Sequence, residues 1–163
     1  MPEGYGIYLI ITAIGRWFNR TVPEIWERAA LFTGSFIGWF YALIYFYHRI
    51  INAPESWMDR AFGEYGLYFW WTPISLLLAS HMPWLKWVRN RPILRLLNGF
   101  WLLFSMEAWV ILNTSMHRDY QTFDFWSFFL PRALNSIIGL FGFVVFTVMM
   151  SFVLKIIQPK EKA

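Results

Sequence analysis

The sequence contains, at residues 133–154, the charge-free apolar stretch ALNSIIGLFGFVVFTVMMSFVL. Its 22 residues would form a helix of about 33 Å at a rise of 1.5 Å per residue. A bilayer hydrocarbon core is about 30 Å thick, so this helix is long enough to cross it. Three more stretches have a similar length and character, and the four together hold a single carboxylate, Glu107. These three stretches cover residues 29–47, 65–85 and 96–116.

The composition agrees with a chain that lies mostly in lipid. Hydrophobic residues make up 58% of the 163 residues and charged residues only 15%, whereas charged residues approach a quarter of an ordinary soluble domain. The segments between the apolar stretches are too short to fold as separate domains of ordinary size. The sequence therefore predicts an all-α membrane protein with four transmembrane helices in one integral membrane domain, residues 1–163.

Two further segments are apolar but do not have the length and continuity of a span. Residues 5–18 carry an apolar run followed by Arg16, and this order of charges is the reverse of that in a secretory signal. We expect an N-terminal amphipathic helix in the membrane interface, with a fifth, short span as the alternative. Residues 120–130 are rich in phenylalanine and precede Pro131, which predicts a short amphipathic helix on the outer face that Pro131 ends.

Basic residues are divided unevenly between the two sides of the predicted spans. Segments 1–28, 86–95 and 155–163 carry ten Lys and Arg residues, whereas segments 48–64 and 117–132 carry four. Short loops rich in Lys and Arg stay in the cytoplasm. Both termini are therefore predicted to be cytoplasmic, in a protein of the bacterial inner membrane.

Small residues predict where the helices contact one another, because helices in lipid associate through close backbone approach. They recur every four residues in the first span and every three in the last. The predicted contact residues are Ala30, Gly34 and Gly38 together with Ser136, Gly139 and Gly142.

Charged residues provide the remaining site candidates. Glu107 lies within the third span, where a carboxylate is unfavourable unless it is paired, hydrated or protonated. It is the first functional candidate, either as a proton carrier or as a structural contact, for example with Arg132. Four basic residues between the second and third spans are the candidate contact with anionic phospholipids. They are Lys86, Arg89, Arg91 and Arg95.

The sequence contains no pattern that supports catalysis. It has no cysteine, no glycine-rich phosphate loop, no GxSxG motif and no histidine cluster spaced for a metal. No cofactor is predicted apart from lipid, and nucleic acid is not an expected partner because the basic residues flank spans.

We therefore expect a non-catalytic subunit of a larger membrane protein complex, with other membrane subunits as partners. The first alternative is a small energy-coupling or redox component that uses Glu107 for protons or binds a quinone, pigment or haem. The second alternative is a small-molecule carrier, which would have an internal repeat and a polar midplane site.

Overall fold

The computed structural model describes residues 2–51, 57–63, 66–103 and 125–157, and all regular structure within them is helical. The prediction of an all-helical chain is confirmed for these residues. The elements are α1 (Pro2–Trp17), α2 (Glu24–Ile51), α3 (Trp57–Phe62), α4 (Gly66–His81), the 3-10 turn η1 (Met82–Trp84), α5 (Lys86–Asn90), α6 (Pro92–Leu103) and α8 (Phe125–Ile157).

Two of the described helices, α2 and α8, are long and apolar enough to cross a membrane. They contain the predicted spans 29–47 and 133–154. The second predicted span is interrupted, because α4 ends at His81 and Met82–Trp84 form a 3-10 turn around Pro83. Proline has no N–H to continue the helical hydrogen bonds. Helix α6 covers the beginning of the third predicted span, and residues 104–116 lie outside the described part of the chain.

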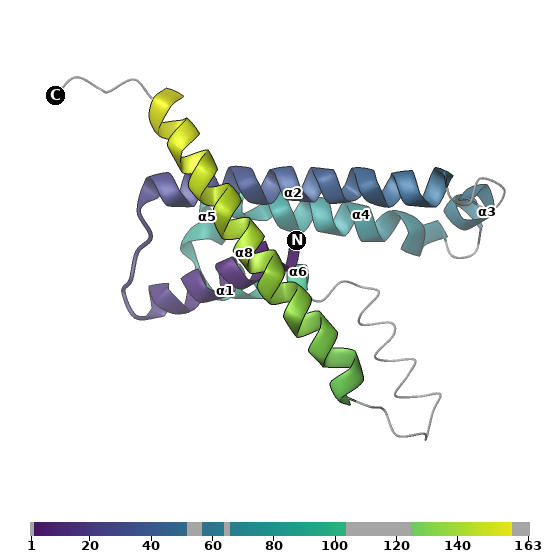
Figure 1. The fold of residues 1–163 in the computed structure, drawn as a ribbon, viewed down its shortest axis with the longest axis horizontal. Coiled ribbons are helices and arrows are strands. Elements are labelled where there is room, and N and C mark those ends of the chain that lie inside the picture. The colour runs from purple at the N-terminus through teal and green to yellow at the C-terminus, as the bar shows by residue number, and fades with distance from the viewer. Residues whose placement is uncertain (1, 52–56, 64–65, 104–124, 158–163) are drawn as a thin grey trace.

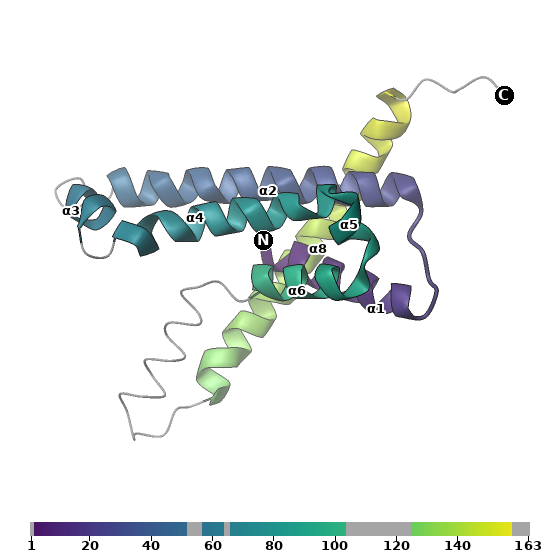
Figure 2. The same ribbon diagram turned by 180° about the vertical axis from the view of Figure 1, so that it is seen from behind.

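The helices form two layers that α8 crosses. Helices α2 and α4 lie side by side and contact each other along their lengths, while α1 and α6 form a second pair (Figures 1 and 2). Helix α8 runs obliquely over α2 and α1 and contacts both (Figure 1). The buried apolar centre lies where these helices meet. It includes Tyr5, Leu9, Ala30, Leu102 and Phe143.

The separate outer-face helix predicted before Pro131 is not found. Residues 125–130 are instead the first turns of α8, which continues through Pro131 to Ile157. Pro131 is the seventh residue of α8 and lies in an exposed position. The seventh position is past the first turn, so Pro131 removes one helical hydrogen bond and its ring crowds the carbonyl four residues earlier, but α8 continues on both sides of it. Residues 120–124 lie outside the description.

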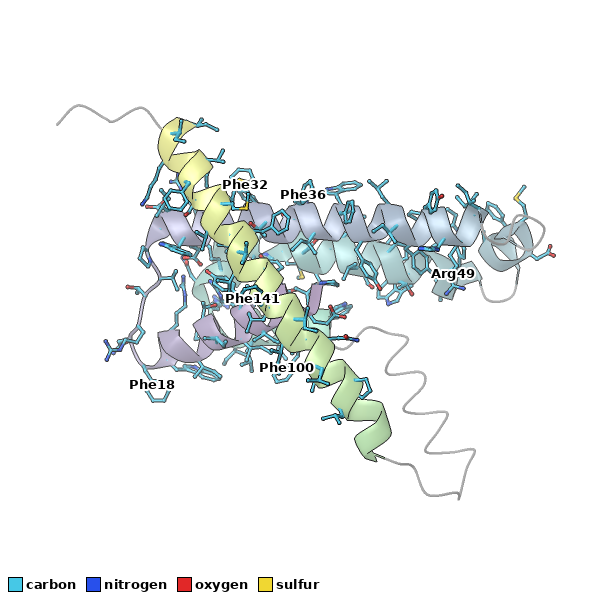
Figure 3. The ribbon with its side chains drawn as sticks, viewed as in Figure 1. Phe18, Phe32, Phe36, Arg49, Phe100 and Phe141 are labelled. Carbon is cyan, nitrogen blue, oxygen red and sulfur yellow. The ribbon has the colours of Figure 1, made fainter. Side chains whose placement is uncertain are left out.

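The N-terminal helix packs inside the protein more deeply than a helix lying on a surface would. The sequence predicts that residues 5–18 turn an apolar face to lipid, but Tyr5 and Leu9 are fully buried in the helical bundle. Only the opposite side of the segment is open, where Ile11, Ile14 and Phe18 are exposed. Phe18 projects outward from the end of α1 in Figure 3.

Glycine makes this packing of α1 possible at two close approaches. A Cβ atom added to Gly6 would lie 2.7 Å from the carbonyl oxygen of Gly99 in α6, and one added to Gly99 would lie 2.8 Å from the Gly6 oxygen. On another side, Gly4 touches the backbone of Gly139 in α8. Helix α1 is therefore in backbone contact with both α6 and α8, in the manner of small-residue contacts between helices in membranes.

Replacing Gly6 by alanine tests the α1–α6 contact. The added methyl group would meet a backbone oxygen that cannot move alone, so we expect Gly6→Ala to destabilise the fold by about 1–3 kcal/mol. Gly15→Ala is the matched control in the same helix, because its Cβ would lie at an ordinary 3.7 Å from Arg20. It should be neutral or stabilising. Thermal unfolding in detergent measures both, and equal stability of the two variants would contradict the contact.

Candidate functional site

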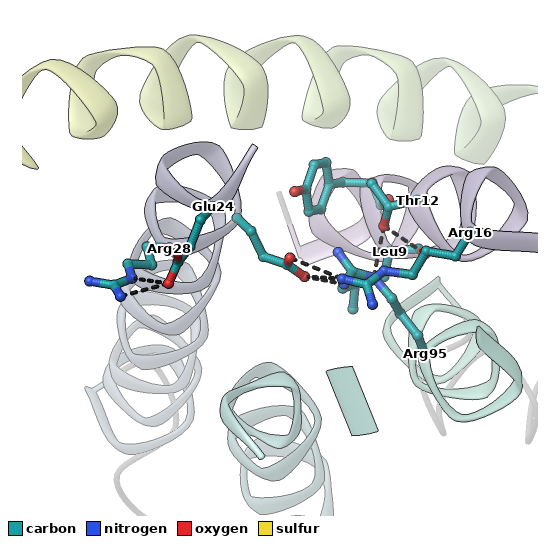
Figure 4. Close-up of polar contacts among 8 residues, drawn as sticks. Leu9, Thr12, Arg16, Glu24, Arg28 and Arg95 are labelled. Carbon is teal, nitrogen blue, oxygen red and sulfur yellow. Dashed lines mark hydrogen bonds and ion pairs between the residues drawn. The ribbon is translucent and has the colours of Figure 1, made fainter. Parts of the chain in front are cut away.

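Two arginines from different helices share one carboxylate in the interior of the protein. Arg16 is in the last turn of α1, Glu27 is in the first turn of α2, and Arg95 is in α6 (Figure 4). The Arg16 Nη2 atom donates to both carboxylate oxygens of Glu27 at 3.0 Å, and Arg95 Nη1 donates to Glu27 Oε1. We call these three residues the ion cluster.

A tight turn places Arg16 against Glu27. Helix α1 ends in a Schellman-type turn, in which the Arg20 N–H donates to the Gly15 carbonyl and the Asn19 N–H donates to the Arg16 carbonyl. Asn19 occupies the left-handed conformation with φ 56°, which asparagine tolerates better than most residues. The turn sends the chain back toward α2, so that Arg16 and Glu27 meet although they are 11 residues apart.

Arg95 is fixed by a second set of contacts on α1. Its Nε donates to Thr12 Oγ1 at 2.8 Å, and its Cζ lies 5.7 Å from the centre of the Tyr8 ring. The Thr12 hydroxyl in turn donates to the Tyr8 carbonyl at 2.8 Å, with the Leu9 carbonyl at 3.1 Å. The Arg95 guanidinium is therefore held by a carboxylate, a hydroxyl and an aromatic face.

Burial makes the ion cluster sensitive to the loss of any partner. The exposed fractions of the Arg95, Glu27 and Arg16 side chains are 2%, 11% and 19%. Charges out of water lose hydration, and only their mutual attraction and hydrogen bonds compensate for that loss. The cluster carries one more positive than negative charge. Its clearest role is to join the ends of α1, α2 and α6 in one relative position.

Two tyrosine hydroxyls lie buried beside the cluster. Burial raises the pKa of Tyr5 and of Tyr8 above the usual phenol value, although Arg95 acts in the opposite direction at both. Both phenols therefore remain protonated at neutral pH. Their rings stack on or tilt against Phe143 of α8, with ring centres 5.2 and 5.4 Å away. Tyr5 and Tyr8 thus connect the ion cluster to α8 through their rings.

The predicted packing residues lie at these helix contacts. Ala30, Gly34 and Gly38 of α2 are buried, with Gly34 against the Tyr5 ring and Gly38 against the Ser80 side chain. In α8, Gly139 is buried against Gly4, while the other two predicted residues are partly buried. These are Ser136 and Gly142.

The four basic residues predicted to contact lipid fall into two environments. Lys86 and Arg91 are exposed and Arg89 is partly exposed, so these three remain available to a head group. Arg95 does not belong with them, because its guanidinium is buried in the ion cluster. The reason is its place one turn inside α6, on the side that packs against α1.

The structure does not describe all of the other predicted candidates. Glu107 lies outside the described residues, and so does the side chain of Arg132 in α8. His81 bonds through Nδ1 with the Leu77 carbonyl at 2.8 Å within its own helix. Among the described residues, no three His, Cys, Asp or Glu side chains are grouped so that they could hold a metal ion.

Local pattern does not identify Arg16 or Glu27 as a site residue. Arg16 is predicted only as the basic end of an interfacial helix, and the contacts to Glu27 span 11 and 68 residues. A charged residue two positions before an apolar stretch is normally a membrane-boundary residue, so no local pattern distinguished Glu27. No significant match to this chain was found among family models, curated proteins or solved structures.

Neutralising Glu27 tests the ion cluster. Glu27→Gln leaves two arginines without a balancing charge, and we expect a loss of about 3–5 kcal/mol in unfolding free energy. Glu24→Gln is the control one turn earlier, because Glu24 pairs with Arg28 on the surface at 2.6 Å and such pairs contribute about 0.5 kcal/mol. Unfolding of both variants in mixed micelles gives the comparison. A loss in Glu27→Gln no larger than that in Glu24→Gln would mean that the cluster does not hold the helices together.

Proposed function

We propose that this chain is a non-catalytic integral subunit of a larger membrane protein complex. The observation that carries the proposal is the distribution of side chains, which is the reverse of that in a soluble protein. Arg95 is among the largest fully buried side chains, whereas large aromatic and aliphatic side chains cover the outside. A soluble monomer rarely exposes so much contiguous apolar surface, but lipid and partner helices both favour it.

Helix α8 supports this proposal most directly. Its most hydrophobic part has a mean hydropathy of 2.6, yet only 22% of that part is buried within the protein. The side chains of Ile138, Phe141 and Phe152 are exposed by 60% or more. A helix that is apolar on all sides belongs in an apolar environment. Within the described part of the chain, α8 contacts α1 and α2 through one side, and we propose that lipid or a neighbouring subunit covers its other sides.

The second spanning candidate, α2, presents an aromatic surface. Phe36, Trp39 and Phe40 are exposed by more than half, and Phe36 and Phe40 stack with ring centres 6.2 Å apart. Phe32 and Phe36 lie along the outer side of α2 in Figure 3. Aromatic residues are enriched in the cores of protein interfaces. This side of α2 is therefore a suitable surface for a partner subunit.

The placement of charge supports a cytoplasmic C-terminal end in this proposal, whereas the N-terminal end of α1 lies near the middle of the molecule (Figures 1 and 2). The end of α1, the beginning of α2 and helix α5 lie at one end of the molecule in both views, on the side where α8 also ends (Figures 1 and 2). That end carries most of the Lys and Arg residues of the described chain, including Arg16, Arg28, Lys86 and Lys155. The positive-inside rule then assigns this end to the cytoplasm. In that orientation Lys86, Arg89 and Arg91 face the anionic head groups of the cytoplasmic leaflet.

Reporter fusions test this orientation. We expect a fluorescent protein fused after residue 163 to be fluorescent, and alkaline phosphatase fused there to be inactive, because both report a cytoplasmic location. The same reporters inserted between residues 52 and 56 should give the opposite pair of results. Active phosphatase at the C-terminus would overturn the orientation and the inner-leaflet assignment.

Purification from the native membrane tests the subunit proposal. Tagged protein extracted in a mild detergent should elute with another membrane protein in fixed stoichiometry, as measured by native mass spectrometry. Phe141→Ala should lower the recovery of that partner without changing stability, because Phe141 is exposed, whereas Phe143→Ala should destabilise the chain because Phe143 is buried. A monodisperse 19.6 kDa monomer without a second protein would refute the proposal.

A further inference from the structure

A short segment between α4 and α6 presents basic and aromatic side chains together. It covers residues 82–91 and includes η1 and α5. Figures 1 and 2 place α5 at one end of the molecule, near the beginning of α2. The three basic side chains and two indole rings of the segment are exposed or partly exposed. We call these five residues the α5 patch: Trp84, Lys86, Trp87, Arg89 and Arg91.

Trp84 attaches the segment to α2. Its Nε1 atom donates to Ser35 Oγ at 2.8 Å, and its ring meets the Phe32 ring edge-on, with ring centres 4.9 Å apart. Two other residues of the segment, Pro83 and Val88, are buried. The α5 patch therefore lies on a backbone that is held at three points along its length.

The acidic side chains at this end of the molecule already have basic partners. The described acidic residues there are Glu24 and Glu27. Glu24 pairs with Arg28 at 2.6 Å, and Glu27 is shared by the two arginines of the ion cluster. Within the described part of the chain, the three basic side chains of the α5 patch form no ion pair. A partner that complements this surface must therefore bring its own negative charge.

The spacing of the basic residues fits a phosphate group. Lys86 and Arg89 are three residues apart in α5, so their Cβ atoms are about 5–6 Å apart on one face and both side chains can reach the same phosphate. A guanidinium donates two parallel hydrogen bonds to phosphate oxygens, and lysine adds a compact positive charge. The two indole rings of the patch are of the kind that prefers the head-group level of a bilayer.

An apolar stripe on α4 leads up to the α5 patch. Ile74 and Leu78 of α4 and Met82 at the start of η1 are exposed, and at a spacing of four residues they follow one side of the helix. A free phosphate ion would use only the basic residues, whereas a phospholipid uses the basic residues, the indoles and the stripe. We propose that the α5 patch binds the head group of an acidic phospholipid, with the acyl chains along this stripe.

A lipid bound there would also affect the ion cluster. This step rests on the proposed membrane location and adds a defined binding site to the general contact with head groups. The Arg95 N–H donates to the Arg91 carbonyl at 3.1 Å, so the patch and the cluster are one helical turn apart. Both carry excess positive charge. A phosphate at the patch reduces their mutual repulsion, and we therefore expect an acidic lipid to stabilise the fold.

Lipid retention by the purified full chain tests the proposal. Nanodiscs of phosphatidylcholine and phosphatidylglycerol in equal amounts are dissolved in mild detergent, and native mass spectrometry identifies the lipid that stays bound. We expect a preference for phosphatidylglycerol that falls about 10- to 30-fold in Lys86→Gln/Arg89→Gln, because each charge near an acidic head group contributes about fivefold. Lys155→Gln removes an exposed basic residue of α8 outside the patch and should keep the preference, as should addition of inorganic phosphate.

Thermal unfolding in nanodiscs separates loss of the site from loss of the fold. In pure phosphatidylcholine the unchanged chain and both variants should unfold at the same temperature. Phosphatidylglycerol should raise that temperature in the unchanged chain and in Lys155→Gln, but much less in the double variant.

Four results would overturn the lipid site. They are equal retention of the two lipids, an equal loss in Lys155→Gln, a preference that inorganic phosphate abolishes, and a double variant that already unfolds earlier in phosphatidylcholine. None of them bears on the subunit proposal, because that proposal is judged by co-purification of a second protein.

Discussion

The arrangement of the inner helices depends on one carboxylate that two arginines share. Glu27 receives hydrogen bonds from Arg16 of α1 and Arg95 of α6 while standing on α2. A salt bridge of this kind contributes little net stability relative to an apolar replacement, but the loss of one partner is costly. Its main effect is on geometry, because the cluster fixes α1, α2 and α6 in one relative position. Glycine contacts at Gly4, Gly6 and Gly99 then set how closely the helices approach.

The ion cluster and the glycine contacts require each other. Short side chains on α1 bring its backbone within van der Waals distance of α6 and α8, and this proximity excludes water from Arg95. Once water is excluded, the guanidinium needs Glu27, Thr12 and the Tyr8 ring as substitutes for hydration. A longer side chain at Gly6 would separate α1 from α6 and weaken the contact between Arg95 and Thr12 as well. Packing and electrostatics are therefore coupled along the same face of α1.

The sequence predicted the features that follow from local pattern. The apolar stretch 133–154 lies in one helix, as does 29–47, because length and hydropathy alone indicate helices at these positions. Pro131 was predicted to end a helix because an internal proline removes a hydrogen bond and crowds the preceding turn, yet α8 continues through it. The burial of Arg95 was not predictable in this way. Nothing near residue 95 indicates a partner at residue 27, and the basic residues around it favoured a surface location.

The placement of charge inside and apolar groups outside connects the fold to the proposed function. In water, the hydrophobic effect would favour burial of the exposed side chains of α8 and exposure of Arg95. In lipid, apolar side chains gain nothing from burial, and helices are joined by hydrogen bonds and close backbone contact. The described helices are joined in this second way, by hydrogen bonds at Glu27 and by close backbone contact at Gly6 and Gly99. Among the described helices those contacts do not use the exposed apolar side chains of α2 and α8, and this is why we propose lipid and partner subunits as the neighbours of these surfaces.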